Sequence, residues 1–428
     1  MLLGLFVLCV YFSVVTYTDQ SPAGGVAATQ LVPAARKHLG ASGRVLIVGR
    51  EQPEELAFVR QLEREFSTAG IGLAGTVVGE PKDARAALQK LAAAGEKIEV
   101  IACTAVTSSW MVFADLKADF PALGAPVVLA PLSYRWPNFL KTDNLLNIAN
   151  QIAVIAIVAI GMTMVIVTGG IDLSVGSLLA LAAVVAARFI RDEAGGTGAT
   201  FYGLLTACVI AVLVCGVVGA FSGLMITQFG IPPFIVTLAM MLVASGMAYL
   251  LAQGQSIYQI PDSFVWLGRG ADLFNLPNSV ILMLVLYGLA HGLMSRMRLG
   301  RYLYAVGGNR EAARLSGVPV ERVLLFAYVA SALLAGLGGV IMASQLKSGS
   351  ATYGNMYELY VIAAVVVGGT SLSGGEGRMF GTLTGAFTIA VIQNGMNLTN
   401  VESYTQKVVL GSVILGAVLL DKVRQRHL

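Results

Sequence analysis

Two glycine-rich polar breaks interrupt long apolar stretches at matching places in the two halves of this chain. The first reads Gly169-Gly170-Ile171-Asp172-Leu173-Ser174-Val175-Gly176, and the second reads Gly368-Gly369-Thr370-Ser371-Leu372-Ser373-Gly374-Gly375. Both fit the pattern Gly-Gly-x-[Asp/Ser]-Leu-Ser-x-Gly, with apolar runs on either side. Backbone freed by such a break cannot face lipid, so it must be buried in protein or line a wet cavity. Paired breaks of this kind are the best sequence indication of a route for solute across a membrane.

The distribution of charge supports a membrane protein. Of the 428 residues, 56% are hydrophobic and 12% are charged, whereas a soluble domain carries about 25% charged residues. Twelve basic and 12 acidic residues lie between Asp19 and Arg135, which makes this segment a neutral polar island. The net charge of +4 does not indicate nucleic acid binding, because no basic stripe or cluster of stacking aromatics accompanies it.

We expect about ten helical spans, several of them shorter than the roughly 17–25 apolar residues that cross the hydrocarbon core; the eighth and ninth flank the second break and are candidates for tilted or broken helices. The candidates are residues 2–17, 145–167, 175–189, 201–226, 234–251, 280–294, 324–343, 359–369, 380–392 and 408–420. Basic residues favour the cytoplasmic side, and they crowd the loop 296–322 and the tail with Lys422, Arg424 and Arg426. This predicts cytoplasmic termini and an island outside, although Arg188 and Arg191 fall in an outer loop.

Three domains follow from this reading. Residues 1–18 form a first transmembrane anchor that we expect to be retained, residues 19–134 a periplasmic α/β domain, and residues 135–428 the transmembrane domain. Within the island, apolar runs at 44–49, 71–78, 98–102 and 127–130 predict strands, and the intervening amphipathic stretches 54–69 and 81–94 predict helices, with a further helical stretch around 110–118. Strands that alternate with helices imply a parallel sheet.

The island resembles one lobe of a type I periplasmic sugar-binding protein at the level of its pattern. Its first strand is not followed by Gly-x-Gly-x-x-Gly, so a dinucleotide site is not indicated. A ligand would lie at the carboxyl ends of the strands, where Arg50, Glu51 and the stretch 104–110 fall; ordinary loop residues are the alternative interpretation. The four cysteines show neither a disulfide framework nor metal-ligand spacing.

Asp172 is the carboxylate of the first break. A charge near the bilayer centre costs about 2.5–3.5 kcal/mol on insertion scales, so it needs a compensating environment. Asp172 is either a polar contact on the substrate path or a cap for the helix that follows, since a capping oxygen satisfies free backbone N–H groups. The second copy has Ser371 there, so the repeat itself does not require the charge.

The basic loop contains a short amphipathic helix, predicted for residues 311–315 and ended by Gly317 as C-cap. Such a helix parallel to the membrane suits docking of a motor subunit, and a solvated loop that only fixes topology is the alternative. Its sequence Glu311-Ala312-Ala313-x-x-x-Gly317 resembles the first half of the coupling motif of ATP-binding cassette (ABC) importer permeases. The usual second half of that motif is missing after Gly317.

The longer strings resemble ribose-type sugar permeases in collinear order from Pro137 to the end of the chain. The strings are 300–317, Pro137-Asn138-Phe139 through 145–148, 161–177, Tyr357-Glu358-Leu359, 368–375 and Asn394-Gly395-Met396-Asn397-Leu398. The family often has an acidic residue after Glu358-Leu359, where this chain has Tyr360. Its members also lack the inserted island.

The resemblance implies an ABC importer for a ribose- or xylose-like monosaccharide that works by alternating access. It implies a permease homodimer in the lipid bilayer of the bacterial inner membrane, a cytoplasmic ABC ATPase subunit and a periplasmic sugar-binding protein. The chain has no Gly-x-x-x-x-Gly-Lys-[Ser/Thr] loop, so we expect no enzyme activity and no cofactor of its own, with ATP used by the partner. The substrate path is predicted at Gly169, Gly170, Asp172, Ser174, Gly368, Gly369, Thr370, Ser371, Asn394 and Asn397, and the ATPase coupling loop at Arg301, Gly308, Asn309, Glu311, Ala312, Ala313, Ser316 and Gly317.

Two functions of other classes compete with this one. An ATP-independent secondary transporter or facilitator would need intramembrane carboxylate or histidine relays, and Asp172 is the main candidate here. The second is a receptor whose membrane part serves only as an anchor. Ten spans with paired breaks disfavour this function. The island is expected to dock the binding protein or to replace it in part.

Overall fold

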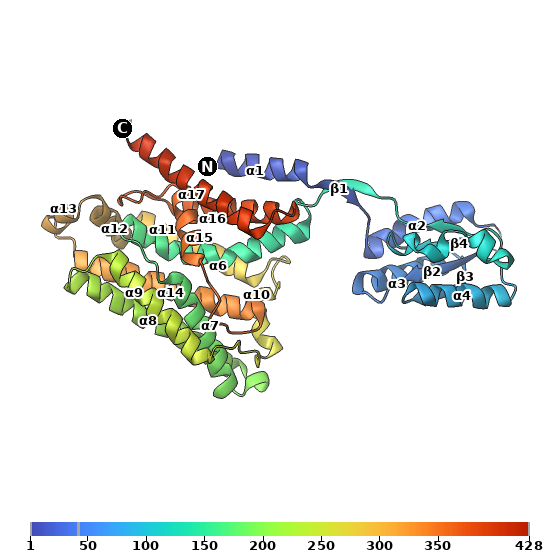
Figure 1. Ribbon diagram of the computed structural model, residues 1–428, viewed down its shortest axis with the longest axis horizontal. Coiled ribbons are helices and arrows are strands. Elements are labelled where there is room, and N and C mark those ends of the chain that lie inside the picture. The colour runs from blue at the N-terminus through green and yellow to red at the C-terminus, as the bar shows by residue number, and fades with distance from the viewer. Residues whose placement is uncertain (1, 41–42, 427–428) are drawn as a thin grey trace. The chain divides into compact units, whose positions relative to one another are not determined.

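The computed structural model describes residues 2–40 and 43–426, and the side chains up to residue 419. It divides into two compact units, Tyr17–Pro137 and the pair of segments Met1–Thr16 and Asn138–Leu428 (Figure 1). The sequence placed these boundaries at residues 18/19 and 134/135. The predicted cytoplasmic Lys422, Arg424 and Arg426 lie outside the described side chains.

The unit Tyr17–Pro137 is built on a four-stranded parallel sheet in the order β3-β2-β4-β5. The strands are β2 (Arg44–Gly49), β3 (Gly72–Val78), β4 (Val100–Cys103) and β5 (Val127–Leu129). Alternate residues of β2 face opposite sides, so Val45 and Ile47 pack with α2 (Gly24–His38) and α3 (Pro53–Thr68). Leu46 and Val48 pack on the other side, with α4 (Pro81–Ala93).

Two parts of this unit differ from the sequence-based expectation. Helix α2, which contains Pro33, was not expected. The helical stretch predicted around 110–118 is a series of short turns, η1 (Thr107–Ser109), η2 (Met111–Phe113), α5 (Leu116–Asp119) and η3 (Pro121–Leu123). The chain enters and leaves the unit through a two-stranded antiparallel ribbon of β1 (Tyr17–Gln20) and β6 (Tyr134–Pro137).

The second unit is helical. Its long helices are α1 (Leu2–Val15), α6 (Thr142–Val167), α7 (Val175–Asp192), α8 (Phe201–Gln228), α9 (Pro233–Ala252), α11 (Asn278–Arg296), α12 (Arg298–Gly308), α14 (Val320–Leu346), α15 (Tyr357–Val367), α16 (Met379–Leu398) and α17 (Ser403–Arg426). Short elements are η4 (Gly196–Gly198), η5 (Asp262–Val265), α10 (Trp266–Arg269) and α13 (Arg310–Leu315). Among the described residues, five helices are long and apolar enough to cross a membrane, namely α6, α8, α9, α11 and α14. The count of ten spans stays a prediction.

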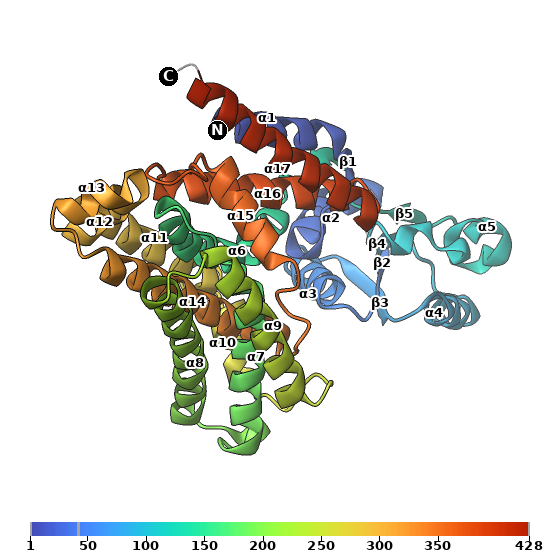
Figure 2. The ribbon, with the colours of Figure 1, turned by 60° about the vertical axis from the view of Figure 1, so that its left-hand side comes forward.

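Helix α14 is the centre of this unit and packs against α6, α7 and α8 (Figure 2). Small residues allow these contacts: a Cβ on Gly161 of α6 would lie 2.5 Å from the Cα of Ser331, and one on Gly339 would lie 2.2 Å from the carbonyl oxygen of Leu179. Gly219 and Gly223 of α8 also lie against α14, and small residues four positions apart allow helix backbones to approach closely.

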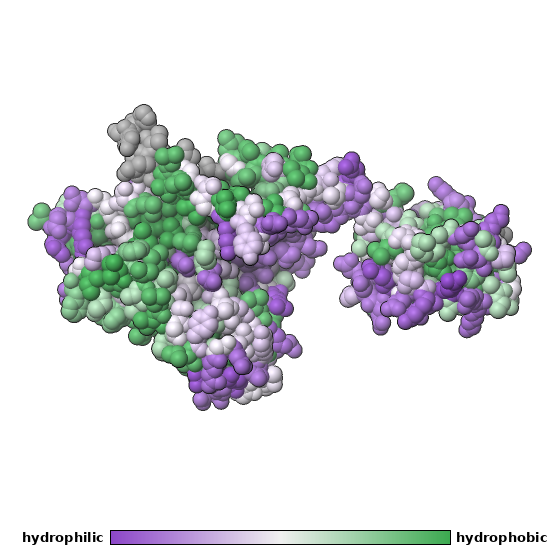
Figure 3. Space-filling view, in the orientation of Figure 1, coloured by the Kyte–Doolittle hydropathy of each residue, from purple (hydrophilic) through white to green (hydrophobic). Residues whose placement is uncertain are grey.

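The helices differ in how much apolar surface they expose. The most apolar part of α6 is 89% buried, whereas that of α8 is 28% buried. Figure 3 shows broad hydrophobic patches on the helical unit, and hydrophilic residues at the end that carries α12 and α13. Helix α6 is therefore an interior helix, and α8 and α9 present the faces suited to lipid.

Candidate functional site

Both predicted breaks are helix ends of the same type. Helix α6 stops at Val167, Gly169 has a φ of +78°, and its N–H donates to the carbonyl of Ile166 at 2.9 Å. The N–H of Gly170 donates to Val165 at 3.1 Å. These two hydrogen bonds define a Schellman motif, in which glycine supplies the left-handed residue.

The second break repeats the motif one residue out of register with the sequence repeat. Helix α15 stops at Val367, and the left-handed residue is Gly369, with a φ of +81°. It is therefore the second glycine of its pair, whereas Gly169 is the first of its own. The N–H groups of Gly369 and Thr370 donate to Val366 and Val365 at 2.8 and 3.2 Å. Residues 368–378 separate α15 from α16, while only residues 168–174 separate α6 from α7.

The two breaks touch each other and the end of α12. The N–H of Gly375 donates to the carbonyl of Val167 at 2.8 Å. A Cβ on Gly307 of α12 would lie 1.7 Å from that same carbonyl oxygen, and one on Gly374 would lie 3.0 Å from the nitrogen of Gly169. We call Gly169, Gly307, Gly374 and Gly375 the glycine contact, because only residues without side chains fit there.

Asp172 is 2% exposed and is satisfied by serine. Its Oδ1 accepts from the N–H and hydroxyl of Ser174 at 3.0 and 2.6 Å, and its Oδ2 accepts from the hydroxyl of Ser331 at 2.8 Å. Ser174 is the N-cap residue of α7 and no side chain caps this helix, so Asp172 holds the turn before α7 and the interpretation of Asp172 as its cap is wrong. In the second break, the Ser371 hydroxyl accepts from the N–H of Ser373 at 3.2 Å, but α16 begins only at Met379.

The depth of the first break can be measured along α14. Ser331 is the twelfth of the 27 residues of α14, about 17 Å from its Val320 end at 1.5 Å per residue. Two buried hydroxyls near the breaks, those of Tyr328 and Thr370, have no hydrogen-bond partner among the described residues. The breaks therefore lie inside the helical unit, in the half nearer the Val320 end of α14.

A third interruption was missed by the sequence reasoning. Residues 347–356 leave the Leu346 end of α14 without helical structure and run back into the unit. Gly349 lies against Ala183 and Ala187 of α7, and Gly354 lies against Gly176, which is about 14 Å nearer the start of α7 than the midpoint of that alanine pair. Helix α15 therefore starts inside the unit and is a half-helix of 11 residues. The run Ser348-Gly349-Ser350 next to an unusually short apolar span was the available signal.

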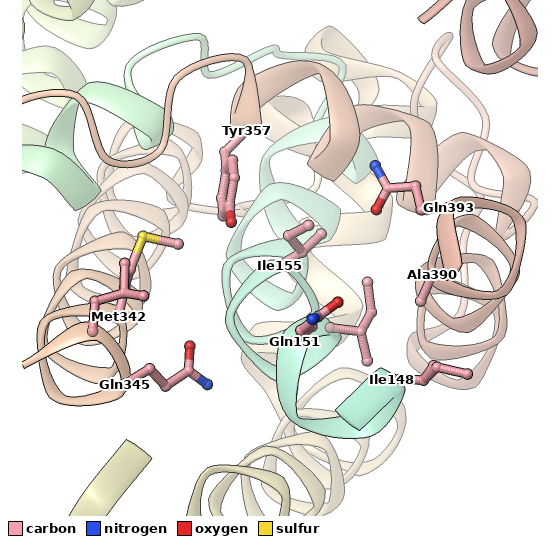
Figure 4. Close-up of a pocket in the computed structure, with 10 residues that line it drawn as sticks. Ile148, Gln151, Ile155, Met342, Gln345, Tyr357, Ala390 and Gln393 are labelled. Carbon is pink, nitrogen blue, oxygen red and sulfur yellow. The ribbon is translucent and has the colours of Figure 1, made fainter. Parts of the chain in front are cut away.

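A cavity of about 240 Å³, which we call cavity 1, lies beside the start of this half-helix. Figure 4 shows the side chains around it, with the hydroxyl of Tyr357 pointing toward the cavity from the first turn of α15. The amides of Gln151 and Gln393 and the Tyr357 hydroxyl have no hydrogen-bond partner among the described residues. The amide of Gln345 donates to Asn150 at 3.0 Å. Apolar residues complete the lining: Ile148, Ile152, Ile155, Met342, Leu346 and Ala390.

A second cavity of about 250 Å³, cavity 2, lies between α7, α9 and residues 351–358. Its lining includes Ser177 and Ser245 together with the carboxylate of Glu358. Tyr357 lines cavity 1 and Glu358 lines cavity 2, so the first turn of α15 borders both.

The predicted path residues line neither cavity, but the first break reaches cavity 2 at Gly176. Gln151 and Val167 are 16 positions apart on α6, about 24 Å, which separates cavity 1 from the glycine contact. Asn394 forms two amide hydrogen bonds with Asn144 at 2.8 and 3.1 Å, and Asn397 accepts from Gln406 at 2.8 Å. The structure brings together Gly169 and the second break, but places the two asparagines elsewhere.

The predicted coupling loop is α12 and α13 with the turn that follows. The Asn309 side chain caps α13 by accepting from the N–H of Ala312 at 2.9 Å. Gly317 has a φ of +81° and ends the helix as expected. The Arg314 guanidinium pairs with Glu321 at 2.5 Å and tethers α13 to the start of α14. The remaining residues predicted for this loop lie on the same two helices and turn: Arg301, Gly308, Glu311, Ala313 and Ser316.

Comparisons with known proteins decide the family. Residues 144–418 match the family model described as "Branched-chain amino acid transport system / permease component". The chain belongs to this permease family. It is 42% identical to the ribose import permease protein RbsC of Escherichia coli K12 over 303 residues, which cover 70% of this chain and 92% of that protein. It is 41% identical to RbsC of Bacillus subtilis over 304 residues, 71% of this chain and 92% of that protein.

A third relative of the permease is the D-allose transport system permease protein AlsC of E. coli K12, 36% identical over 285 residues, with 67% of this chain and 85% of that protein covered. No solved structure matches the chain. The permease is thus a multi-pass inner-membrane protein, and its family match begins at residue 144, after the α/β unit.

Proposed function

We propose that this permease imports a ribose-like monosaccharide and that cavity 1 is a sugar site on its route. The observation that carries the proposal is the lining of cavity 1, which combines two unpaired amides and one unpaired hydroxyl with apolar walls. Sugar hydroxyls both donate and accept, as amides do. A volume of about 240 Å³ is below the range of about 300–1,000 Å³ for drug-sized ligands, so a small solute fits.

The same lining argues against an amino acid as the cargo, although the family description names branched-chain amino acids. An amino acid carries an ammonium and a carboxylate, and each needs a charged or strongly polar partner away from water. Among the residues that the structure describes, none with a charged side chain lines cavity 1. The named cargoes of the relatives, ribose and allose, agree with a neutral solute.

Orientation and partners belong to the same proposal. The arginine-rich α12 and α13 face the cytoplasm and receive an ABC ATPase subunit, while the permease pairs with a second copy in the bilayer. A periplasmic binding protein delivers the sugar to the outer face of the helical unit, and the unit Tyr17–Pro137 is exposed to the periplasm. This unit docks the binding protein or takes over part of its task, and its deletion should lower the affinity or rate of uptake.

In the proposed cycle, the glycine contact carries the motion of the ATPase to the substrate route. Gly307 at the end of α12 lies against the last carbonyl of α6 and against Gly375 of the second break, so a displacement of α12 must move both. An opening at the breaks would hydrate the buried hydroxyls of Tyr328 and Thr370, which lack partners in this state. The breaks act as the inner gate, and cavity 1 lies toward the outer side.

Uptake of labelled D-ribose, D-xylose and D-allose tests the proposal in cells that express the permease with its ATPase and binding protein. We expect saturable uptake that unlabelled leucine does not inhibit. Gln151→Ala or Gln393→Ala should raise the KM about 2–12-fold, because each removes a hydrogen bond worth about 0.5–1.5 kcal/mol. Gln255→Ala, at an exposed site away from the cavity, is the control. Leucine uptake, or sugar uptake driven by an ion gradient without the ATPase, would overturn the proposal.

A further inference from the structure

Cavity 2 has the features of a second site on the route. Seven polar side chains line it: Ser177 of α7, Ser245 and Tyr249 of α9, Thr352, Tyr353 and Asn355 of the loop, and Glu358 of α15. The hydroxyls of Thr352 and Tyr353 pair with Ser350 and Ser348, and the Glu358 carboxylate accepts from its own backbone N–H. The side chains of the other four have no hydrogen-bond partner among the described residues. Polar groups without partners are costly against lipid, so this concave surface is suited to water or a polar solute.

The Glu358 carboxylate sets cavity 2 apart from cavity 1. It is half-buried, and no ion pair within the described residues neutralises it. Ionisable groups within membrane segments mark substrate routes. The surrounding groups are hydroxyls and an amide, which do not cancel the charge. Cavity 2 therefore combines acceptors for hydroxyl hydrogens with a negative potential.

The position of cavity 2 relates it to both cavity 1 and the breaks. Gly176, the second residue of α7, lines it, and α7 begins directly after the first break. Gly176 is also packed against Gly354 and Glu358, since a Cβ there would lie 2.4 Å from the Glu358 carboxylate. The first turn of α15 thus lies between the two cavities, and cavity 2 is the one next to the inner gate.

We propose that cavity 2 is a second binding station for the neutral sugar, at which Glu358 accepts hydrogen bonds from hydroxyl groups and repels anions. This inference rests on the proposed function and adds a selectivity to it. Sugar acids and phosphorylated sugars carry a negative charge, so the carboxylate would exclude them from the inner part of the route. Cavity 1, which has no charged residue, would not make this distinction.

Cysteine labelling of the full chain in membranes tests the station independently of transport. In a background with the four native cysteines replaced by alanine, Ser245→Cys places a thiol in cavity 2, and Gln255→Cys places one at an exposed position beyond the end of α9. We expect S245C to react with a cationic methanethiosulfonate at least about tenfold faster than with an anionic one, because of the nearby carboxylate. Glu358→Gln should remove that preference, and saturating D-ribose should slow labelling several-fold in S245C and not in Q255C.

Two results would overturn the inference. The first is that S245C is labelled at the same rate with and without D-ribose, in membranes where the unmutated permease imports D-ribose. This would show that the sugar does not bind in cavity 2, and it would leave the proposed function intact. The second is that S245C shows the same preference for the cationic reagent with and without Glu358→Gln. This would show that Glu358 does not set the selectivity of cavity 2. Absence of any sugar uptake would instead count against the proposed function, and the charge preference would still report on cavity 2.

Discussion

Substituting Gly307 by alanine is the sharpest test of the glycine contact. A Cβ at this position would lie 1.7 Å from the carbonyl oxygen of Val167 and 2.6 Å from the nitrogen of Gly375. Both atoms belong to the backbone, and they share the 2.8 Å hydrogen bond that joins the two breaks. The methyl group must therefore push α12 away or separate the breaks.

The expected cost can be estimated from three contributions. Overpacking costs about 1–3 kcal/mol, and loss of the hydrogen bond costs about 0.5–1.5 kcal/mol. The better helix propensity of alanine returns about 1 kcal/mol. Because the clash is with backbone, we expect a net loss of about 2–3 kcal/mol for Gly307→Ala.

The neighbouring Gly308 is the matched control. It belongs to the same helix, and a Cβ there would meet no atom within 4 Å, so Gly308→Ala should be neutral or slightly stabilising. Thermal unfolding of the purified permease should separate the two variants clearly. ATP-driven sugar uptake per folded molecule should fall in G307A and not in G308A. If G307A unfolds and transports like G308A, the breaks and α12 are not in the contact described here.

Three further predictions concern single side chains. Asp172→Asn should keep most of the stability and uptake, since an amide oxygen can still accept from Ser174. Asp172→Ala should lower the free energy of unfolding by about 1.5–3 kcal/mol, because it removes the hydrogen bonds to the carboxylate. An equal loss in both variants would show that the charge itself is required. Thr382→Val should cost about 1 kcal/mol in thermal unfolding, because its hydroxyl lies 2.8 Å from that of Thr163 in a buried pair, and an unchanged unfolding temperature would contradict this. Burial raises the pKa of the Cys103 thiol to about 12, so the folded state favours the protonated thiol. The contribution of this thiol to the free energy of unfolding is complete below about pH 8.5 and is lost as the pH rises toward 12. A variant that keeps Cys103 alone should resist alkylation at pH 9 until it is denatured, and rapid labelling of the folded protein would refute this.

The sequence predicted the elements whose signals are local. Strand β2 covers the expected residues 44–49, and Gly317 ends α13 with the expected left-handed backbone. The glycine breaks were also found, because a break in an apolar run is visible in one dimension. Their one-residue phase difference was not, since it depends on which glycine of each pair becomes left-handed.

The parts that escaped prediction depend on contacts between distant segments. Gln151 and Gln393 come from two helices and meet Tyr357 only because residues 347–356 turn back into the unit. Each glutamine alone is a single polar residue in an apolar run, which has no local signature. The family strings directed attention to the breaks and to the asparagines 394 and 397, whereas cavity 1 is lined by the neighbouring Gln393.

Helix α15 explains how events at the breaks can reach cavity 1, which lies about 24 Å away. One end of this half-helix carries Tyr357 and Glu358, which line the two cavities, and the other ends at the second break. It is held closely to α16, because a Cβ on Gly385 would lie 2.0 Å from the carbonyl oxygen of Ala364. A hydrogen-bonded helix of 11 residues moves as one piece. A shift of α12 against Gly375 would therefore displace the second break, carry α15 with it, and change the wall between cavity 1 and cavity 2.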